Sequence, residues 1–398
     1  MGQPHIGPGE ERVRIQPSPY AEMNKADKEF QEIAHCGGQI TIDTKTDERG
    51  HRLASFGVRH SSPTAAAWFM LWANPLGEPI ATVPIGGLAD PPDEPAQAPP
   101  GFQVMLASDS EGMFGHECPR CRGYWRSRGA PALWPMSCPY CHLRTGTHNF
   151  RTVAQRKFIY AVCAKFEEVI QSDFVGETVI DMDAVAAAVA SEEKPQFYYA
   201  EERQQNQFTC AACSGQNDIL GRYGFCSLCG THNGLQELQA DLGRARARID
   251  AGNSYEGALS DIVSAFDSYA RQLAKQLARI PMRRRRREAL ETRLFHNIKP
   301  RATELKAWFD LDLFDRVSDA DIEFAHRMFL RRHVYEHNGG EVDERYIKES
   351  GDTTVRPKQH LRETAESAGR LADLVEVIGK NLKVGFDDIF PAESKPLQ

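Results

Sequence analysis

The sequence lacks an apolar run long enough to cross a membrane. Its longest such run, residues 65–73 (AAAWFMLWA), is about half of the roughly 18–20 residues that span a bilayer. The first twenty residues are polar and proline-rich and lack the apolar core of a signal peptide. We therefore expect a cytoplasmic protein without a membrane partner. In that reducing compartment, closely paired cysteines indicate metal more often than disulfides.

The chain also has little excess of charge of either sign. Its 398 residues carry 48 Lys+Arg and 55 Asp+Glu, and 41% are hydrophobic, enough for the cores of two or three domains. The acidic excess lies wholly within residues 1–235. In the neutral remainder, residues 279–301 carry nine basic and two acidic residues, whereas 302–326 carry two basic and seven acidic residues. Only local patches can therefore indicate a nucleic-acid partner.

The order of the sequence patterns predicts an α+β multidomain fold. Alternating apolar and polar residues indicate a small β-rich region, and five prolines at 89–100 indicate a linker. Apolar residues spaced by three and four predict helices at about 255–277 and 359–383. A further helix is expected at about 288–298, after Pro281 and an arginine run, and another at 318–338, where Ser318 is followed by Asp319 and Asp321 in the first turn. The expected division is a flexible tail (1–30), a small β-rich domain (31–88), a proline-rich linker (89–105), zinc ribbon 1 (106–149), a helical connector (150–200), zinc ribbon 2 (201–233), a connecting helix (234–253) and an all-α bundle (254–390).

Eight of the ten cysteines form four Cys-x2-Cys pairs in two successive units. Two intervening residues let a tight turn aim both sulfurs at one ion, and four thiolates complete a tetrahedral zinc site. Such a site is structural, with no open position for water, so zinc-dependent hydrolysis is not expected. A metal-free arrangement and a redox Cys-x2-Cys are the weaker alternatives. The predicted zinc ligands are Cys118, Cys121, Cys138 and Cys141 in the first unit and Cys210, Cys213, Cys226 and Cys229 in the second.

The two units also share features outside the cysteines. The tetrapeptide Gly-Thr-His-Asn follows the last cysteine of each, at 146–149 and 230–233, and precedes a helical pattern. Its Thr or Asn suits a helix N-cap. Cys163 is expected in a core, and Cys36 is ambiguous. The histidines near the units are expected to be surface or capping residues, although one could replace a cysteine ligand: His116, His142, His148 and His232.

Two basic segments are candidate nucleic-acid contacts. The first unit interleaves arginines with aromatic rings, which could neutralise phosphates and stack on bases at about 1–3 kcal/mol each. The alternative is that the rings pack on the unit's own sheet and the arginines are solvated. An arginine run before a predicted helix could guide RNA or be a solvated charge run. The residues concerned are Arg120, Arg122, Tyr124, Trp125, Arg126 and Arg128, and Arg283, Arg284, Arg285, Arg286 and Arg287.

The most informative stretch is FLRRHVYEHNGGEVDERYI (329–347). Arg332 and His337 stand in an Arg-x4-His spacing, His333 follows the arginine, and Asn338-Gly339-Gly340 should end the helix. Together with the helical pattern around it, this resembles the Arg-x4–6-His motif of the HEPN superfamily, over about residues 250–390. In the branch of this superfamily whose toxins are paired with nucleotidyltransferase antitoxins, a tyrosine stands two residues after the histidine. This chain has Gly339 at that position. We therefore do not expect control by AMPylation.

The resemblance implies a metal-independent ribonuclease that acts as a homodimer, with Arg332 and His337 as catalytic residues and His333 assisting. RNA is then the expected substrate, and a regulatory protein is a further candidate partner, as in bacterial toxins and phage-defence proteins. At about 100° per residue, Arg332 and His337 point roughly 140° apart, which favours a site shared between two subunits.

Two other functions stay open at this point. Arg332 could pair with Glu336 as an ordinary surface contact and His337 could cap the helix end. The chain would then be a non-catalytic zinc-ribbon adaptor that binds nucleic acid or protein and dimerises through its helices. A structural or regulatory partner of an enzyme is the third possibility.

Overall fold

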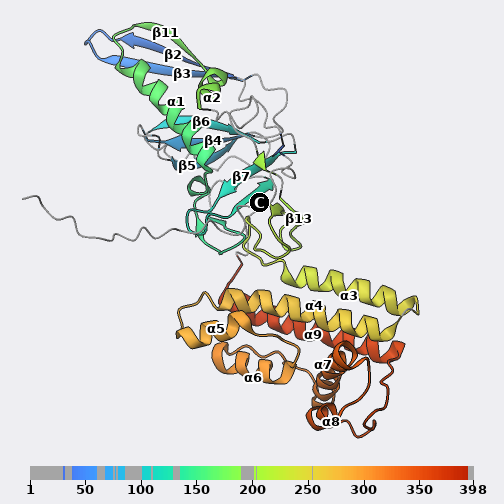
Figure 1. Ribbon diagram of the computed structural model, residues 1–398. Helices are drawn as coiled ribbons and strands as arrows, with labels where there is room; N and C mark the ends of the chain where they lie inside the picture. Colours follow the sequence, from blue (N-terminus) through green and yellow to red (C-terminus); the bar gives the residue numbers. More distant parts are fainter. Residues whose placement is uncertain are drawn as a thin grey trace, which may run out of the picture.

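The computed structural model describes residues 30–31, 38–60, 68–74, 77, 79–85, 101–108, 111–128, 135–189, 201–202, 204–252 and 254–392. The expectations for the tail up to residue 29, for the prolines at 89–100 and for Cys36 lie outside these residues. The described part is a mixed α/β structure with small sheets at one end and a bundle of helices at the other (Figure 1). None of its helices is long and apolar enough to span a bilayer.

The N-terminal part contains two three-stranded antiparallel sheets. One has the order β11-β2-β3 and the other the order β5-β4-β6, and a helix, α1, lies along both (Figure 1). The elements are β2 (Gly38–Thr46), β3 (Arg52–His60), β4 (Trp68–Ala73), β5 (Pro79–Ile85), β6 (Phe102–Ala107), α1 (Val153–Gln171), β11 (Gly176–Asp181) and α2 (Met182–Val189), with a short pair formed by β1 (Phe30–Gln31) and β12 (Glu201–Glu202).

Residues 31–88, predicted to be a separate small β-rich domain, do not form a complete sheet and core by themselves. Strand β11 pairs with β2 from Gly176↔Thr44 to Asp181↔Gln39, so the expected helical connector at 150–200 contributes a strand to the first sheet. Ile40 and Ile42 of β2 share one core with Phe158, Val162 and the fully buried Cys163 of α1. The prediction that Cys163 is a core residue is confirmed. The β-rich region therefore becomes a folded unit only with the help of residues more than a hundred positions later.

The two cysteine units share a single sheet. Its order is β13-β14-β8-β7, formed by β7 (Met113–Glu117), β8 (Tyr124–Arg128), β13 (Asn206–Thr209) and β14 (Gln216–Ile219). The junction is the pairing of Asp218 with Arg126 and of Asn217 with Ser127. The first unit adds the pair β9 (Met136–Ser137) and β10 (Arg144–Thr145) and a 3-10 turn (Thr147–Asn149). Two successive sequence repeats therefore fold as one body.

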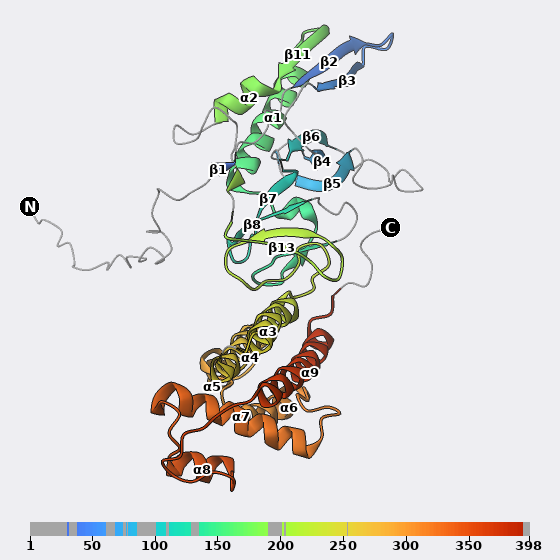
Figure 2. The ribbon, with the colours of Figure 1, turned by 90° about the vertical axis from the view of Figure 1, so that its right-hand side faces the viewer.

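Helices occupy the rest of the described chain. They are α3 (Gly234–Asp250), α4 (Tyr255–Leu277), α5 (Arg284–Thr292), α6 (Ile298–Phe309), α7 (Asp319–Asn338), α8 (Glu344–Ser350) and α9 (Ala365–Ile389). Figure 2 shows α3, α4 and α9 side by side, and their apolar residues form the largest core. The predicted boundaries of α4 and α7 are confirmed. Ser318 caps α7 by accepting from the Asp321 N–H, and Gly339 ends it at φ +59°.

Other predicted helix boundaries were wrong. The helix expected at 288–298 is instead the end of α5, a break at 293–297 and the start of α6. The break occurs because Asp267 of α4 accepts a hydrogen bond from the Phe295 N–H, a tertiary contact that the local pattern does not contain. Helix α9 begins at residue 365, after the Thr364 capping box, and not near 359.

The end of α9 packs on the second cysteine unit. The Phe225 ring stacks on His142, with centroids 4.2 Å apart, and lies 6.1 Å from Phe386 of α9. His232 lies edge-on to Phe386 at 5.7 Å. Arg222 of the same unit forms ion pairs with Glu237 and Asp241 of α3. These contacts fix the cysteine units to the helices at one end of the bundle.

Two glycines of α9 provide a matched test of this packing. A Cβ at Gly379 would lie 2.5 Å from a methyl group of the buried Leu238 on α3, whereas a Cβ at Gly369 meets nothing within 4 Å. We expect Gly369→Ala to raise the free energy of unfolding by up to about 1 kcal/mol through helix propensity. Gly379→Ala should lower it because α3 must move. Urea unfolding measures both, and an equal gain in the two variants would contradict the close approach.

Candidate functional site

The four Cys-x2-Cys turns have the same backbone geometry. In each, the N–H of the residue after the second cysteine donates to the carbonyl of the first, and that residue has a positive φ. The four residues are Arg122 (+59°), His142 (+55°), Ser214 (+59°) and Gly230 (+77°). Only one of them is a glycine, so the sequence does not reveal the left-handed position. The repeated turn aims each pair of sulfurs at one point.

The eight sulfurs gather into two groups of four, as predicted. Within each group every sulfur lies within 4.8 Å of the others. The contacts across the pairs are 3.6 Å for Cys118–Cys141 and Cys121–Cys138, 3.7 Å for Cys210–Cys229 and 3.6 Å for Cys213–Cys226. A tetrahedral zinc ion with Zn–S bonds of about 2.3 Å requires sulfurs about 3.8 Å apart. Both groups are therefore compatible with zinc, and the separations are too long for disulfides.

The nearby histidines are not part of the sulfur groups. Among the described residues, the groups that could hold a metal consist of cysteines alone. The Nδ1 of the buried His232 accepts from the Gly234 N–H at the start of α3, and burial lowers the pKa of His232 to about 3. In the second unit the histidine of the tetrapeptide, and not its Thr or Asn, therefore accepts a hydrogen bond at the start of the helix that follows. Asn233 instead bridges to Gly224 and Arg222, and in the first unit Thr152 caps α1.

Two of the predicted nucleic-acid contacts in the first unit were wrong. Trp125 is 0% exposed and packs against His116 and Phe150, so its ring is not open to a base. Arg126 is also 0% exposed, and its guanidinium lies 2.6 Å from the buried Asp218 carboxylate. This ion pair joins the two cysteine units. The remaining predicted residues are half-buried (Tyr124) or exposed (Arg120, Arg122 and Arg128).

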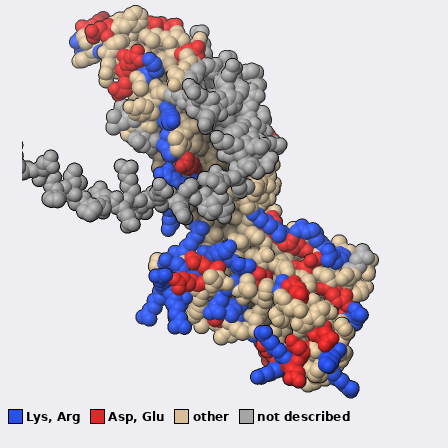
Figure 3. All heavy atoms as spheres, viewed as in Figure 1, with Lys and Arg blue, Asp and Glu red and all other residues tan. Residues whose placement is uncertain are grey.

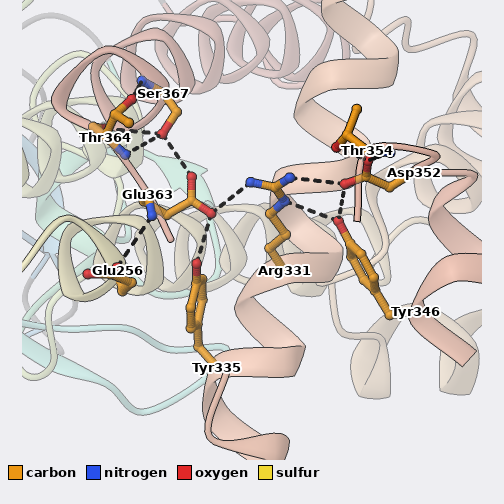
Figure 4. Close-up of polar contacts among 9 residues, drawn as sticks. All are labelled: Glu256, Arg331, Tyr335, Tyr346, Asp352, Thr354, Glu363, Thr364 and Ser367. Atoms are coloured by element: carbon orange, nitrogen blue, oxygen red, sulfur yellow. Dashed lines mark hydrogen bonds and ion pairs between the residues drawn. The ribbon is translucent and has the colours of Figure 1, made fainter. Parts of the chain in front are cut away.

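On α7, Arg331 lies at the centre of a buried charge network (Figure 4). It lies 3.0 Å from Asp352 and 3.1 Å from Glu363, two carboxylates that are at most 3% exposed. The hydroxyls of Tyr346 and Tyr335 donate to Asp352 and Glu363 respectively. Burial acts to raise the pKa of Asp352, but its hydrogen bonds to Thr354, Arg331 and Tyr346 outweigh this and hold that pKa well below its usual value.

The next residue, Arg332, points to a different part of the bundle. Its guanidinium lies 2.7 Å from Glu336, one turn along α7, and 3.2 Å from Nδ1 of His296 in the α5–α6 connection. His296 in turn lies 3.4 Å from Asp267 of α4. The Arg332 side chain is 12% exposed and that of His296 32%. The contact with Glu336 is the one that the sequence offered as the alternative to catalysis.

His333 and His337 form a second pair on α7. Both are exposed, and their ring centroids are 4.4 Å apart. Burial, followed by the charge of His337, lowers the pKa of His333. Arg332 pairs with Glu336 on one strip of α7, and His333 contacts His337 on another. Arg332 and His337 therefore lie on different strips of the helix. This agrees with the divergence calculated from the helical period.

The arginine run lies at the start of α5. Residues 283–287 are all exposed, and Figure 3 shows basic side chains gathered on the side of the bundle where Figure 1 places α5. Arg284 forms an ion pair with Glu288, and Arg286 lies over the Trp308 ring at 5.6 Å. Helix α5 then leads to His296, nine residues beyond Arg287.

Asp267 and His296 were missed by sequence reasoning. Asp267 interrupts the apolar face of α4 between Phe266 and Tyr269, and a charged residue in that position could have indicated a buried polar contact. Nothing in the local sequence marks His296. Its partner Arg332 is 36 positions away, and only the packing of the α5–α6 connection on α7 brings the two together.

The Arg331 network predicts a large stability effect at one of the two adjacent arginines. Arg331→Met leaves two buried carboxylates without their cation, which we expect to cost about 3–5 kcal/mol of unfolding free energy. Arg345→Ala serves as a control, because this exposed arginine forms a solvent-accessible i,i+4 pair with Glu349. Its urea midpoint should match that of the parent. Equal midpoints for the parent and Arg331→Met would contradict the network.

No protein-family model, curated protein or solved structure matches this chain.

Proposed function

We propose that the chain is a metal-independent endoribonuclease of HEPN type. The observation that carries the proposal is α7 itself, which holds Arg332 and His337 in its last two turns and ends at Gly339 in the left-handed conformation. The resemblance of this stretch to the HEPN motif supplies the reaction. Its biological setting would be that of a toxin or a phage-defence protein.

The chemistry of RNA cleavage suits these residues. Attack by the 2′-OH on the neighbouring phosphate requires a proton acceptor, a proton donor for the leaving 5′-oxygen and a cation for the phosphorane. The fork of an arginine guanidinium matches phosphate oxygens and stays charged. Histidine titrates near neutral pH, and the carbonyl end of a helix favours its protonated form. Arg332 is thus suited to the phosphate and His337 to proton transfer, with His333 in contact with the His337 ring.

A homodimer would bring the two residues to one phosphate. Arg332 faces His296 and the α5–α6 connection, while His337 is exposed on another strip of α7. One copy of the helix does not easily direct both side chains at the same atom. Two copies related by a dyad can do so, with Arg332 from one subunit and His337 from the other.

The exposed arginines of α5 are the proposed path for RNA. Residues 283–287 carry five positive charges. One of these residues, Arg284, forms an ion pair with the Glu288 carboxylate. The helix from residue 284 to 292 is about 13 Å long at 1.5 Å per residue and leads toward His296 and Arg332. A strand bound along α5 would therefore reach the proposed site within a few nucleotides.

The two sulfur groups are proposed to hold structural zinc in two zinc ribbons. Four thiolates around each ion close its coordination sphere, so zinc would stabilise the shared sheet and take no part in cleavage. The ribbons would recognise a target or a regulatory protein. The burial of Trp125 and Arg126 limits direct nucleic-acid contact in the first ribbon to the exposed Arg120, Arg122 and Arg128.

One observation favours the second candidate, a non-catalytic zinc-ribbon adaptor that dimerises through its helices. Arg332 lies 2.7 Å from Glu336 in an i,i+4 ion pair, an ordinary structural contact along a helix that needs no substrate. This function predicts binding to nucleic acid or protein that weakens when the exposed ribbon arginines are neutralised, and no cleavage.

We expect the purified chain to cleave single-stranded RNA in the presence of EDTA. Arg332→Ala and His337→Ala should each reduce the rate by about 100-fold or more, because each removes a group that acts on the transition state. Gel analysis of a fluorescent RNA measures the rate, and metal analysis of the same sample verifies that zinc is retained.

Two other residues of the same types serve as controls. Arg316, with a side chain 92% exposed, precedes α7 and stands sixteen residues before Arg332, whereas His51 lies in the turn between β2 and β3. In the described part of the chain neither contacts Arg332 or His337: Arg316 faces Asp315 and His51 faces Asp47. Arg316→Ala and His51→Ala should cleave like the parent. The proposed activity is wrong if Arg332→Ala and His337→Ala also cleave like the parent, and an inactive parent favours the adaptor.

The zinc proposal has its own test. Native mass spectrometry should detect two zinc ions per chain, and Cys121→Ser or Cys213→Ser should retain at most one. Because the two units share a sheet, either substitution should also lower the melting temperature of the whole cysteine-containing body. Cys163→Ala, which removes a buried sulfur outside both groups, should keep two ions. Two ions bound by either ligand variant would contradict the assignment.

A further inference from the structure

We infer that His296 is a further catalytic residue of the proposed ribonuclease site, acting as the proton acceptor for the RNA 2′-OH, and that Asp267 is its positioning residue. This inference rests on the proposed function and adds to it a group that the Arg-x4-His motif does not contain. The observation behind it is the continuous line of contacts from Asp267 through His296 to Arg332.

The location of His296 brings an imidazole to the same phosphate as Arg332. Its Nδ1 lies 3.2 Å from the Arg332 guanidinium, and its side chain is 32% exposed, so a substrate held by the arginine can touch the ring. The charged groups around the ring are Asp267 and Arg271 of α4 and Arg332 and Glu336 of α7. Two of them are acidic and two are basic.

The contact with Asp267 determines which ring nitrogen carries the proton. The Arg332 guanidinium nitrogen lies 3.2 Å from Nδ1 and 3.5 Å from Nε2, so this contact does not select a tautomer. The Asp267 carboxylate, 3.4 Å from Nε2, can only accept a hydrogen bond. The proton of the neutral ring is then on Nε2, which faces the Asp267 carboxylate. Nδ1 is therefore the free base of the ring, and it lies on the side from which a phosphate bound to Arg332 would approach.

Asp267 is fixed before any substrate binds. It is 6% exposed, and its Oδ1 accepts from the Phe295 N–H at 2.6 Å, in the residue next to His296. Burial acts to raise the pKa of Asp267, but the contacts with His296, the Phe295 N–H and Arg271 outweigh it and lower that pKa below its usual value. An ionised carboxylate behind an imidazole holds the ring's orientation and stabilises the imidazolium when it forms.

The proposed step balances in atoms and charge. A scissile phosphate draws the Arg332 guanidinium away from Nδ1, and the 2′-oxygen attacks phosphorus while its proton passes to Nδ1. The bond from phosphorus to the 5′-oxygen breaks, and that oxygen takes a proton from the protonated ring of His337 of the partner subunit. The products are a 2′,3′-cyclic phosphate and a 5′-hydroxyl. His296 ends as an imidazolium facing Asp267 and returns its proton to water.

A second histidine is needed because the two protons move on opposite sides of phosphorus. His333 and His337 share one strip of α7, with rings 4.4 Å apart, so both approach a phosphate from the same side. His296 is on the Arg332 side of the helix. The chain therefore carries imidazoles on two separate faces, which suits an acceptor and a donor.

The test compares the cleavage rate of a fluorescent RNA as a function of pH in the parent, His296→Ala and Asp267→Asn. His296→Ala should lose about 100-fold or more in kcat/KM, within the usual range for a general base. Added imidazole should restore part of that rate. Asp267→Asn keeps an acceptor for the Phe295 N–H but removes the charge that favours the imidazolium, so the acidic limb of its pH–rate profile should move to lower pH.

His51→Ala is the matched control, because His51 also contacts a carboxylate, Asp47, at 3.2 Å but lies in the turn between β2 and β3. Urea midpoints near that of the parent would exclude misfolding as the cause of a lost rate. If His296→Ala cleaves like the parent while His337→Ala is inactive, the role of His296 is overturned and the proposed function stands. A lost rate that imidazole does not restore, with an unshifted profile in Asp267→Asn, also overturns it. An inactive parent overturns both.

Discussion

The ion pairs of Arg331 with two buried carboxylates are the constraint on which the proposed site depends. Two nearly inaccessible carboxylates, Asp352 and Glu363, accept this one guanidinium and tie α7 to the segment between α8 and α9. Because successive residues on a helix differ by about 100°, fixing Arg331 inward turns Arg332 toward the α5–α6 connection. The network therefore determines the direction in which Arg332 points from α7.

A buried ion pair likewise joins segments distant in sequence in the cysteine units. Arg126 and Asp218 lie at the junction of β8 and β14 and join two sulfur groups in one sheet. The aromatic contacts of Phe225 with Phe386 then attach this body to the end of α9. The proposed zinc ribbons are thus not independent modules on a linker, and a partner bound to them would contact a body that is packed directly on the helices.

Local signals in the sequence were reliable where the physical cause is local. The Cys-x2-Cys spacing located all eight sulfurs, and Ser318 and Gly339 fixed both ends of α7. The prediction of a helix at 288–298 was wrong because it could not include a tertiary contact. The Asp267 carboxylate, on α4, accepts a hydrogen bond from the Phe295 N–H at the break between α5 and α6. The prediction that Trp125 and Arg126 are surface contacts was wrong for two reasons. Trp125 packs on His116 and Phe150 of its own unit, the alternative that the sequence had left open, and Arg126 pairs with Asp218 of the second unit, which the local sequence does not reveal.

The sequence by itself therefore determined the four Cys-x2-Cys pairs, the helix that carries Arg332 and His337, and the basic run at the start of α5. Each of these is set by residues within a few positions of one another. Only the tertiary structure decided that Arg331 pairs with Asp352 and Glu363, that Arg126 meets Asp218 across 92 positions, and that His296 reaches Arg332 across 36. Such contacts depend on how distant segments pack, and no local pattern of residues encodes them.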